Sequence, residues 1–520
     1  MVADSTSGAD MIGRRELIGG GLALGMVAAS PANARGDRVT MVAAADGLYG
    51  SHNGGGAPYR FRGIRYARAS RFARPVVVTK AEQFGPDRTA SRPDGRKDRE
   101  PTFGPACPQT GNRYQPQSED CLFLNVWTPS VDGRERRPVM VYFYGGAYST
   151  GSVTDPVNDG ARLAMRGDVV VVTVNHRLNA LGYLYLAGLD PRFPDSGNAG
   201  QLDLIVALRW VRRNIAAFGG DPGNITVFGQ SGGGAKIATL MAMPEAKGLF
   251  HKAITMSGQQ VTASGPVNAT KRAQAFLHKL GEGVDPVTAP VEQLVAALSA
   301  TDPILGGGVY MGPVLDMRNL SRHPFWPDAA PQSLGIPMML GNTAMETRAF
   351  YASDGRQLAG LGFDNLAARI APEMRIDIGP EWVVGEFRAR YPQAEPVELF
   401  HRIVTSARSW RGQVEEAEAR ARAGHPAFVY QLDFEQAKHA DDIALCFGTV
   451  ADPTPARQAM SDRVMDAFVR FARTGDPGWP AYTLDARPTM IFDTESRVEN
   501  DPRRWERELF ARAPYIQPGS

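Results

Sequence analysis

Residues 225–240 read Ile-Thr-Val-Phe-Gly-Gln-Ser-Gly-Gly-Gly-Ala-Lys-Ile-Ala-Thr-Leu, which places Gly229, Ser231 and Gly233 in a G-x-S-x-G pattern. The four residues before Gly229 are β-branched or aromatic and predict a strand, and the residues after Gly233 are compatible with a helix. A serine in this context lies in a strained turn, where glycines leave room for the strand and the helix to pass each other. The pattern therefore predicts an exposed Ser231 hydroxyl at the positive N-terminal end of a helix.

Short apolar runs rich in β-formers recur along the rest of the chain, with helical stretches between them. Such runs are typical of parallel strands that are buried on both faces by helices. Apolar residues within 204–215 share one face of a helix and complete a β-α-β crossover. Helical segments around 270–300 and 360–424 are expected to be insertions that cover the edge of the sheet. The expected strands are residues 139–144, 169–174, 225–228, 253–256, 337–340 and 428–432.

The overall composition excludes several classes of protein. The chain has 520 residues, of which 43% are hydrophobic and 22% are charged, which predicts a soluble globular protein with a large core. Lys and Arg number 57 against 55 Asp and Glu, a balance that does not suit a surface built to neutralise phosphates. A nucleic-acid partner is therefore not expected. The sequence contains no motif with metal-ligand spacing and no phosphate-binding loop, so neither a metal nor a cofactor is expected.

Residues 1–34 are expected to be an export signal. Arg14 and Arg15 precede the apolar residues 17–29, and Ala32-Asn33-Ala34 has the small-x-small pattern of a cleavage site. The paired arginines resemble a twin-arginine signal, and an ordinary secretory signal is the alternative. The apolar stretch is shorter than the ~20 residues that a membrane-spanning helix needs. These features predict a periplasmic or secreted protein without a membrane span, in which Met1 or Met11 is the start.

An exposed serine is a weak nucleophile unless a base takes its proton, and the base in turn needs an orienting acid. Ligands of parallel sheets bind at the carboxyl ends of the strands, so the base should follow a strand closely. His439 comes seven residues after the expected strand 428–432, whereas His425 precedes that strand. His401 lies within a helical segment. His439 is therefore the expected base.

The same reasoning selects the acid and the groups that stabilise an oxyanion. Glu346 follows the expected strand 337–340, and the next carboxylate, Asp354, is more distant. Glu346 is therefore the expected acid. Residues 145–148 read Gly-Gly-Ala-Tyr directly after the strand 139–144, and their small side chains allow backbone N–H groups to approach a ligand. The Gly232 N–H is expected to be a further donor.

Two longer segments resemble the signatures of the type-B carboxylesterases, the family that includes cholinesterases and bacterial para-nitrobenzyl esterases. Residues 119–129 read Glu-Asp-Cys-Leu-Phe-Leu-Asn-Val-Trp-Thr-Pro, and residues 218–222 with 228–233 carry the second signature around Ser231. The resemblance implies an α/β-hydrolase fold, with a large, mostly parallel central sheet that helices flank. It also implies that residues 35–520 form a single domain in which helical insertions cover a gorge leading to Ser231.

The resemblance further implies a serine carboxylesterase that cleaves small-molecule esters through an acyl-enzyme intermediate. Its residues would be Ser231, Glu346 and His439 as a catalytic triad, with Gly146, Ala147 and Gly232 as oxyanion donors and a Cys107–Cys121 disulfide. Two alternatives are a carbamate or amide hydrolase that uses the same triad and a binding protein without catalysis. The oligomeric state stays open.

Three positions depart from the family pattern. Many relatives have a glutamate directly before the serine, where this chain has Gln230, so cationic esters should lose an electrostatic attraction. Ala147 replaces a glycine but keeps the N–H group. Ala440 replaces the usual glycine after His439, without an evident consequence.

Overall fold

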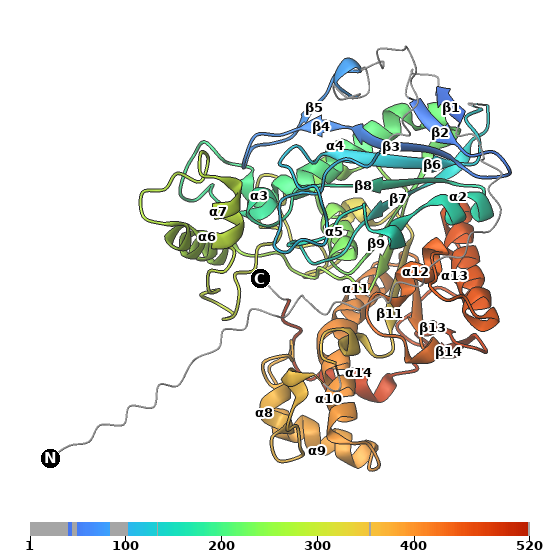
Figure 1. The fold of residues 1–520 in the computed structure, drawn as a ribbon. Helices are drawn as coiled ribbons and strands as arrows, with labels where there is room; N and C mark the ends of the chain where they lie inside the picture. Colours follow the sequence, from blue (N-terminus) through green and yellow to red (C-terminus); the bar gives the residue numbers. More distant parts are fainter. Residues whose placement is uncertain (1–39, 44–48, 84–101, 133, 353–354, 518–520) are drawn as a thin grey trace.

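The computed structural model describes residues 40–43, 49–83, 102–132, 134–352 and 355–517. The expected export signal, residues 1–34, lies outside these ranges. Figure 1 shows a large twisted sheet at the centre, with helices packed around it. Within the described ranges, none of the helices combines the length and the apolar character that a bilayer-spanning helix requires.

The central sheet has twelve strands among the described residues, and its middle is parallel. Strands β8, β7, β9, β10, β11, β12 and β13 are parallel neighbours in this order, and antiparallel strands complete both edges. The parallel strands are β7 (Arg137–Phe143), β8 (Val170–Val174), β9 (Gly220–Gln230), β10 (Lys252–Met256), β11 (Met338–Thr343), β12 (Ala427–Leu432) and β13 (Pro488–Phe492). All six expected strands are confirmed, and β9 begins earlier than expected.

Apolar runs did not reveal the remaining strands, because those toward the edges are short or carry polar and exposed residues and the buried strand Phe123–Thr128 contains the polar Asn125. On one side they follow the order β1, β2, β3 and β6, and on the other β14 pairs with β13. These strands are β1 (Thr40–Ala43), β2 (Tyr49–His52), β3 (Tyr59–Arg65), β6 (Phe123–Thr128) and β14 (Arg497–Asn500). A separate small pair joins β4 (Ala67–Arg68) and β5 (Val76–Val77).

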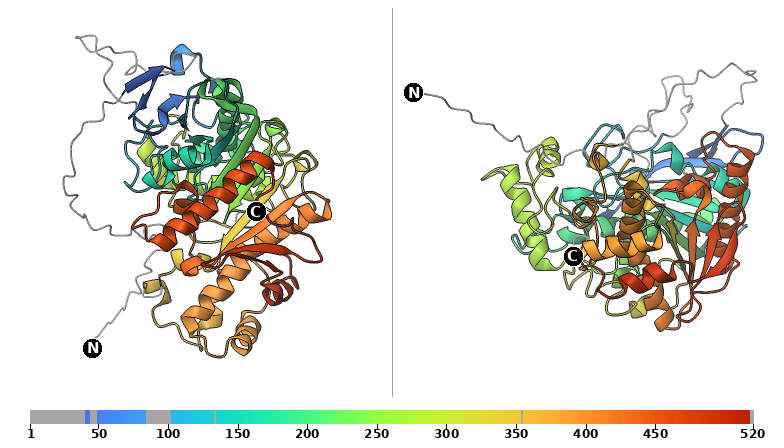
Figure 2. Two further views of the ribbon diagram at one scale, coloured as in Figure 1. Left: turned by 90° about the vertical axis from the view of Figure 1, so that its right-hand side faces the viewer. Right: turned by 90° about the horizontal axis from the view of Figure 1, so that it is seen from below.

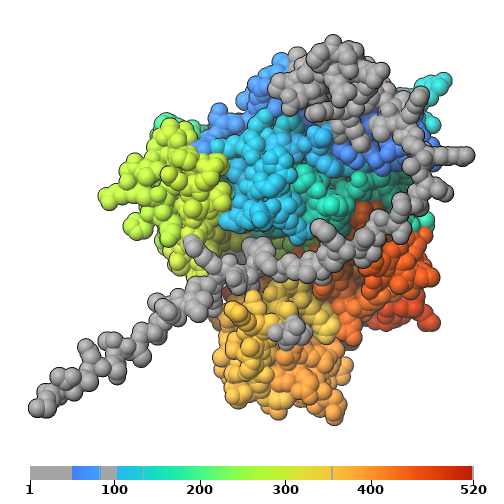
Figure 3. Space-filling view, in the orientation of Figure 1, coloured from blue at the N-terminus to red at the C-terminus, as the bar shows by residue number. Residues whose placement is uncertain are grey.

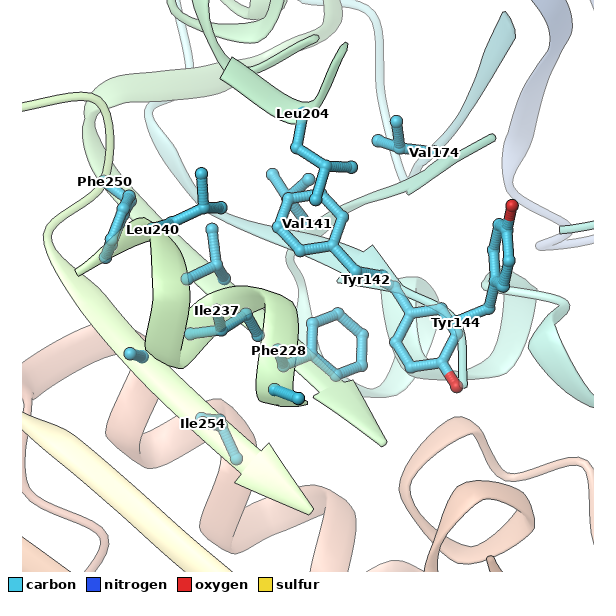
Figure 4. Packing of buried hydrophobic residues seen from close by; sticks show 14 of the residues in the cluster. Val141, Tyr142, Tyr144, Val174, Leu204, Phe228, Ile237, Leu240, Phe250 and Ile254 are labelled. Carbon is cyan, nitrogen blue, oxygen red and sulfur yellow. The ribbon is translucent and has the colours of Figure 1, made fainter. Parts of the chain in front are cut away.

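Helices pack against the parallel strands and complete the α/β architecture. The expected crossover helix is α4 (Ala199–Asn214), which contacts β9 and α5 (Gly232–Leu240). Figure 4 shows Ile237 and Leu240 of α5 beside Phe228 of β9 and Ile254 of β10. The long helix α13 (Pro455–Thr474) packs on β7 and β9 and is visible across the sheet in Figure 2. Shorter helices near the sheet are α2 (Ala161–Gly167), α3 (Asn179–Tyr183) and α12 (Asp441–Phe447).

The two expected helical insertions are present. Residues 266–297 form α6 (Pro266–Leu280) and α7 (Val291–Ala297), which pack on each other. The second insertion has its own hydrophobic cluster and forms a distinct lobe in Figure 3. This cluster includes Leu366, Phe387, Leu399 and Phe510. The helices of the second insertion and the C-terminal helix beside it are α8 (Leu366–Ile370), α9 (Pro380–Arg390), α10 (Pro396–Val404), α11 (Arg411–Arg422) and α14 (Arg504–Phe510).

Candidate active site

Ser231 occupies the turn between β9 and α5, in a backbone conformation that non-glycine residues rarely adopt. Its φ and ψ are 55° and −123°. Strain of this kind costs on the order of 1–3 kcal/mol and persists where the surroundings impose it. The Ser231 N–H donates to the Met256 carbonyl at 2.7 Å, which ties the turn to the end of β10. The hydroxyl itself makes no hydrogen bond with another described residue, and the serine is partly exposed.

The glycines of the turn are required by close packing, as the sequence predicts. A Cβ atom at Gly233 would lie 1.9 Å from the Phe143 carbonyl oxygen of β7. A Cβ atom at Gly229 would lie 2.7 Å from the Gly233 carbonyl carbon. Heavy atoms cannot approach so closely, so strand and helix can pass each other only without side chains at these two positions.

Glu346 lies immediately beyond β11, in a short helical turn (Glu346–Ala349), and its side chain is completely buried. One carboxylate oxygen, Oε2, accepts a hydrogen bond from His439 Nδ1. The other, Oε1, accepts hydrogen bonds from the Ser257 hydroxyl at 2.6 Å, the Thr343 N–H at 2.8 Å and the Asn342 amide at 3.2 Å. The structure thus brings together the two residues that the sequence selects as acid and base.

Burial and hydrogen bonding act in opposite directions on Glu346. Burial raises the pKa of a carboxyl group, but the His439 charge and the hydrogen bonds from His439, Ser257 and Thr343 lower it. The net effect is a pKa of Glu346 below its ordinary value. The carboxylate is therefore ionised at neutral pH and holds a proton on His439 Nδ1, which leaves Nε2 as an acceptor.

Ser257 and Asn342 are site residues that the sequence analysis missed. Ser257 directly follows β10, and its backbone has a φ of 50°. It therefore lies at the same carboxyl edge of the sheet from which Glu346 and His439 were selected. The rule that identified those two residues would have found Ser257 if it had been applied to the 253–256 strand as well.

His439 precedes α12 and points toward the serine turn. Its Nε2 lies 3.1 Å from the side-chain nitrogen of Gln230, the residue before Ser231. An amide nitrogen can only donate, so Gln230 donates to the imidazole in this structure. The Phe350 ring flanks the imidazole, with 4.7 Å between the ring centroids. The structure therefore places His439 beside the turn, with Gln230 rather than Ser231 as its hydrogen-bond partner.

Ala440, which follows His439 and replaces the glycine that the family resemblance implies, adopts a backbone conformation that favours glycine. Its φ is 78°, in the left-handed region that glycine occupies without strain. Ala440 adopts this conformation at the start of α12 and so allows the chain to turn immediately after the imidazole.

The expected oxyanion loop follows β7 and contacts the serine turn. Gly146 and Ala147 have φ values of 82° and 53°, and neither N–H donates to another described residue. Gly232 packs on this loop so tightly that a Cβ there would lie 2.0 Å from the Ala147 carbonyl oxygen. The three expected donor residues therefore lie next to each other, and the convergence of their N–H groups on one point remains a prediction.

The expected Cys107–Cys121 disulfide is not formed in the structure. Both residues are buried free thiols. The Cys121 thiol is hydrogen bonded to Cys107, and this contact together with burial raises the pKa of Cys121 well above its ordinary value. Among the described residues, no cluster of three or more His, Cys, Asp or Glu is arranged to hold a metal ion.

Comparison with known proteins identifies the family. Residues 39–509 match the family model described as the carboxylesterase family. The para-nitrobenzyl esterase of Bacillus subtilis is 34% identical over 78% of this chain and 87% of its own length. A probable N-octanoylanthranilate hydrolase of Rhodococcus erythropolis is 35% identical over 84% of this chain and 94% of its own length.

Solved structures show the same relationship. The crystal structure of a carboxylesterase of Geobacillus stearothermophilus at pH 6.2 superposes with a TM-score of 0.77 and 35% identity, covering 91% of this chain and 100% of that chain. A para-nitrobenzyl esterase structure gives a TM-score of 0.73 at 31% identity, covering 90% and 99%. The chain belongs to the type-B carboxylesterase family of the α/β-hydrolase superfamily and is a carboxylic ester hydrolase.

Proposed function

We propose that the chain hydrolyses small-molecule carboxylic esters through an acyl-enzyme intermediate, with Ser231 as nucleophile, His439 as general base and Glu346 as the group that orients the imidazole. The observation that carries the proposal is the bond between Glu346 Oε2 and His439 Nδ1 beside the strained Ser231 turn. An imidazole that a carboxylate orients beside a serine hydroxyl can take the hydroxyl proton at neutral pH and so activates the serine as a nucleophile.

The first half of the cycle acylates the serine. His439 Nε2 first gives up the hydrogen bond that it accepts from the Gln230 amide and accepts one from the Ser231 hydroxyl instead. It then takes the hydroxyl proton as the serine oxygen attacks the ester carbonyl. The buried Glu346 carboxylate stabilises the imidazolium that forms. The N–H groups of Gly146, Ala147 and Gly232 donate hydrogen bonds to the carbonyl oxygen and stabilise its negative charge. The imidazolium then protonates the leaving alcohol.

The second half releases the acid. A water molecule gives a proton to His439 Nε2 and attacks the acyl carbonyl, and the same donors stabilise the second tetrahedral intermediate. His439 returns the proton to Ser231 as the carboxylic acid leaves. Gln230 is uncharged, so the site is expected to favour neutral over cationic esters.

Amide hydrolysis by the same residues is the second candidate. It is favoured by the likeness to the Rhodococcus protein named as a probable N-octanoylanthranilate hydrolase, whose name describes an N-acyl substrate. Rates on an ester and an amide with the same acyl group distinguish the two activities.

For location, the expected signal in residues 1–34 leads us to propose export to the periplasm or medium, and N-terminal sequencing of the protein from its host tests this.

The proposed nucleophile is tested by Ser231→Ala. The variant should lose hydrolysis of para-nitrophenyl acetate and keep the thermal unfolding midpoint of the wild type, because the hydroxyl makes no hydrogen bond within the described residues. Turnover by the variant would refute the assignment. Absence of turnover in the wild type on a panel of esters and amides would favour a binding protein instead.

A further inference from the structure

Lys236 is a completely buried lysine on α5, five residues after the serine. Its ammonium nitrogen donates to the Ala147 carbonyl at 2.7 Å and lies 3.4 Å from the Tyr144 carbonyl. The same nitrogen is 5.1 Å from the centre of the Tyr148 ring and 5.7 Å from that of Tyr144. The lysine therefore binds both ends of the expected oxyanion loop, residues 144–148.

The groups around Lys236 do not neutralise its charge. Within the described residues it forms no ion pair with a carboxylate, and its titratable neighbours are His176, Tyr144 and Tyr148. Burial and the lysine charge hold the pKa of His176 far below its ordinary value, and burial raises the pKa of both tyrosines. From α4, the Gln201 amide donates to the Lys236 backbone carbonyl. All of these groups are uncharged at neutral pH.

A buried cation without a counter-ion destabilises a folded protein, so packing alone does not account for Lys236. Burial lowers the pKa of Lys236 to about 7. A methionine has nearly the same length and would fill the same space without the desolvation penalty. A residue that destabilises the fold at the edge of an active site is a candidate for a functional role.

The carbonyl at 2.7 Å from Lys236 belongs to Ala147, a residue in an unusual backbone conformation. Ala147 has a φ of 53°, and its carbonyl is also pressed against Gly232. The Ala147 N–H lies in the peptide plane of the Gly146 carbonyl, which accepts from the Ser149 and Thr150 N–H groups at 3.1 Å. Lys236 holds the next peptide plane, on the other side of the Ala147 Cα, so the two sets of hydrogen bonds together restrict rotation at Ala147.

We propose that Lys236 is a positioning residue, whose ammonium group holds the Tyr144 and Ala147 carbonyls so that the Gly146 and Ala147 N–H groups face the oxyanion, and whose positive charge favours the negative transition state. The inference rests on the proposed function. It concerns the oxyanion loop, and the identity of the nucleophile does not depend on it.

Loss of the lysine should lower kcat and leave KM nearly unchanged, because the oxyanion exists only in the transition state. Lys236→Met should lower kcat for para-nitrophenyl acetate by about 10²-fold, the typical loss for one oxyanion donor, and leave KM within about threefold. Affinity for a trifluoromethyl ketone, which forms an oxyanion with the serine, should fall by a similar factor. The thermal unfolding midpoint should be unchanged or higher, which a structural lysine would not produce.

The ratio of kcat/KM between wild type and variant should also depend on pH. It should decrease as pH rises from 6 to 9, because the wild-type lysine loses its charge over this range and keeps only its hydrogen bonds. Lys236→Gln, which keeps a donor but lacks the charge, should have an intermediate kcat and a ratio to Lys236→Met that is independent of pH. If Lys236→Met does not fold, the ratio of kcat/KM between wild type and Lys236→Gln decides the question: it should decrease from pH 6 to 9, and a ratio that is independent of pH overturns the inference.

Lys252→Met is the matched control. Lys252 is a buried lysine at the start of β10, at the opposite end of the strand from Met256 and the serine turn, where it contacts Asn224. Its substitution should leave kcat and KM unchanged, because Lys252 does not contact the loop after β7 or the serine turn within the described residues. The inference is overturned if Lys236→Met keeps kcat within threefold, or if it loses kcat and stability together. If the wild type itself is not labelled at Ser231 by an organophosphate, the proposed function fails, independently of Lys236.

Discussion

Replacing the buried Lys236 by methionine should stabilise the protein at low pH, because the desolvation penalty that is removed exceeds the cost, about 1–3 kcal/mol, of leaving the Tyr144 and Ala147 carbonyls without this donor. The ordinary pKa of lysine is 10.5, and burial lowers it to about 7 in the folded protein. Between these values the unfolded chain carries a proton that the folded chain lacks, so the stability of the wild type rises with pH across this window. Below about pH 7 both states are charged, and the penalty for burying the charge is constant.

The magnitude follows from the same two values. A difference of one pKa unit corresponds to about 1.36 kcal/mol, so the interval from about 7 to 10.5 corresponds to roughly 5 kcal/mol at low pH. At pH 9 the folded lysine is neutral, and the same two pKa values give a cost of about 2 kcal/mol for burying Lys236. The stability advantage of Lys236→Met over the wild type should therefore shrink by about 2.5 kcal/mol between pH 6 and pH 9.

Urea unfolding of both proteins at pH 6, 7.5 and 9, followed by tryptophan fluorescence, measures this difference. Ser231→Ala provides a control with no change in buried charge, and its stability relative to the wild type should not depend on pH. A difference between Lys236→Met and wild type that is constant from pH 6 to 9 would show that the lysine is not a desolvated cation. A variant that is less stable than the wild type at every pH would show that Lys236 is a net stabilising residue, which would refute the reasoning.

Three further predictions concern the acid, its hydrogen-bond donor and the residue before the serine. Glu346→Gln should lower kcat by about 10⁴-fold with little change in KM, because the amide no longer fixes the imidazole tautomer, and steady-state kinetics on para-nitrophenyl acetate measures this. Ser257→Ala should reduce the free energy of unfolding by about 1–3 kcal/mol at pH 7, because it removes the hydroxyl that donates to the buried carboxylate at 2.6 Å. Hydrogen bonds that lower the pKa of Glu346 stabilise the fold at pH values above the pKa of this carboxyl in the unfolded chain. The loss of stability in Ser257→Ala should therefore disappear as the pH falls below the pKa of Glu346 in the folded protein. A loss of stability that does not depend on pH would contradict the assignment. Gln230→Glu should lower KM for acetylthiocholine relative to an uncharged ester of the same shape, and equal KM changes for the two substrates would contradict it.

The sequence predicted the centre of the sheet because parallel strands buried on both faces are continuous apolar runs. Residues such as 170–174 and 253–256 have no exposed positions to interrupt the pattern. The edge strand β14 alternates little and is largely exposed, so nothing in its composition distinguished it from a loop. β14, β1 and β2 form by pairing with strands that are near in sequence, not because they are apolar runs themselves. β6 pairs with β3 and β8, which are distant in the chain, and that information is not local.

The candidate acid and base were predictable because the sheet imposes a rule on where side chains converge. Glu346 and His439 each follow a parallel strand, and the structure joins them across 93 positions of sequence. The contact between His439 and Gln230 depends on the rotation of two side chains within the turn and could not be obtained from order along the chain. The predicted Cys107–Cys121 disulfide is absent from the structure, in which the two cysteines are buried thiols in hydrogen-bond contact, and spacing in the sequence does not distinguish these two states.

Lys236 shows a different limit of the sequence analysis. Within residues 234–240 it is compatible with a helix, and a lysine on a helix is usually exposed. Only the structure shows that α5 is enclosed on all sides, so that this side chain ends against the loop that follows β7.

The central claim is that Ser231 is the nucleophile that His439 and Glu346 activate. Reaction of the wild type with diisopropyl fluorophosphate, followed by proteolysis and mass spectrometry, tests it directly. The account predicts one phosphoryl group per chain, located on Ser231, at a rate that falls sharply in His439→Gln and Glu346→Gln. No incorporation, incorporation at another residue, or an equal rate in those two variants would contradict it.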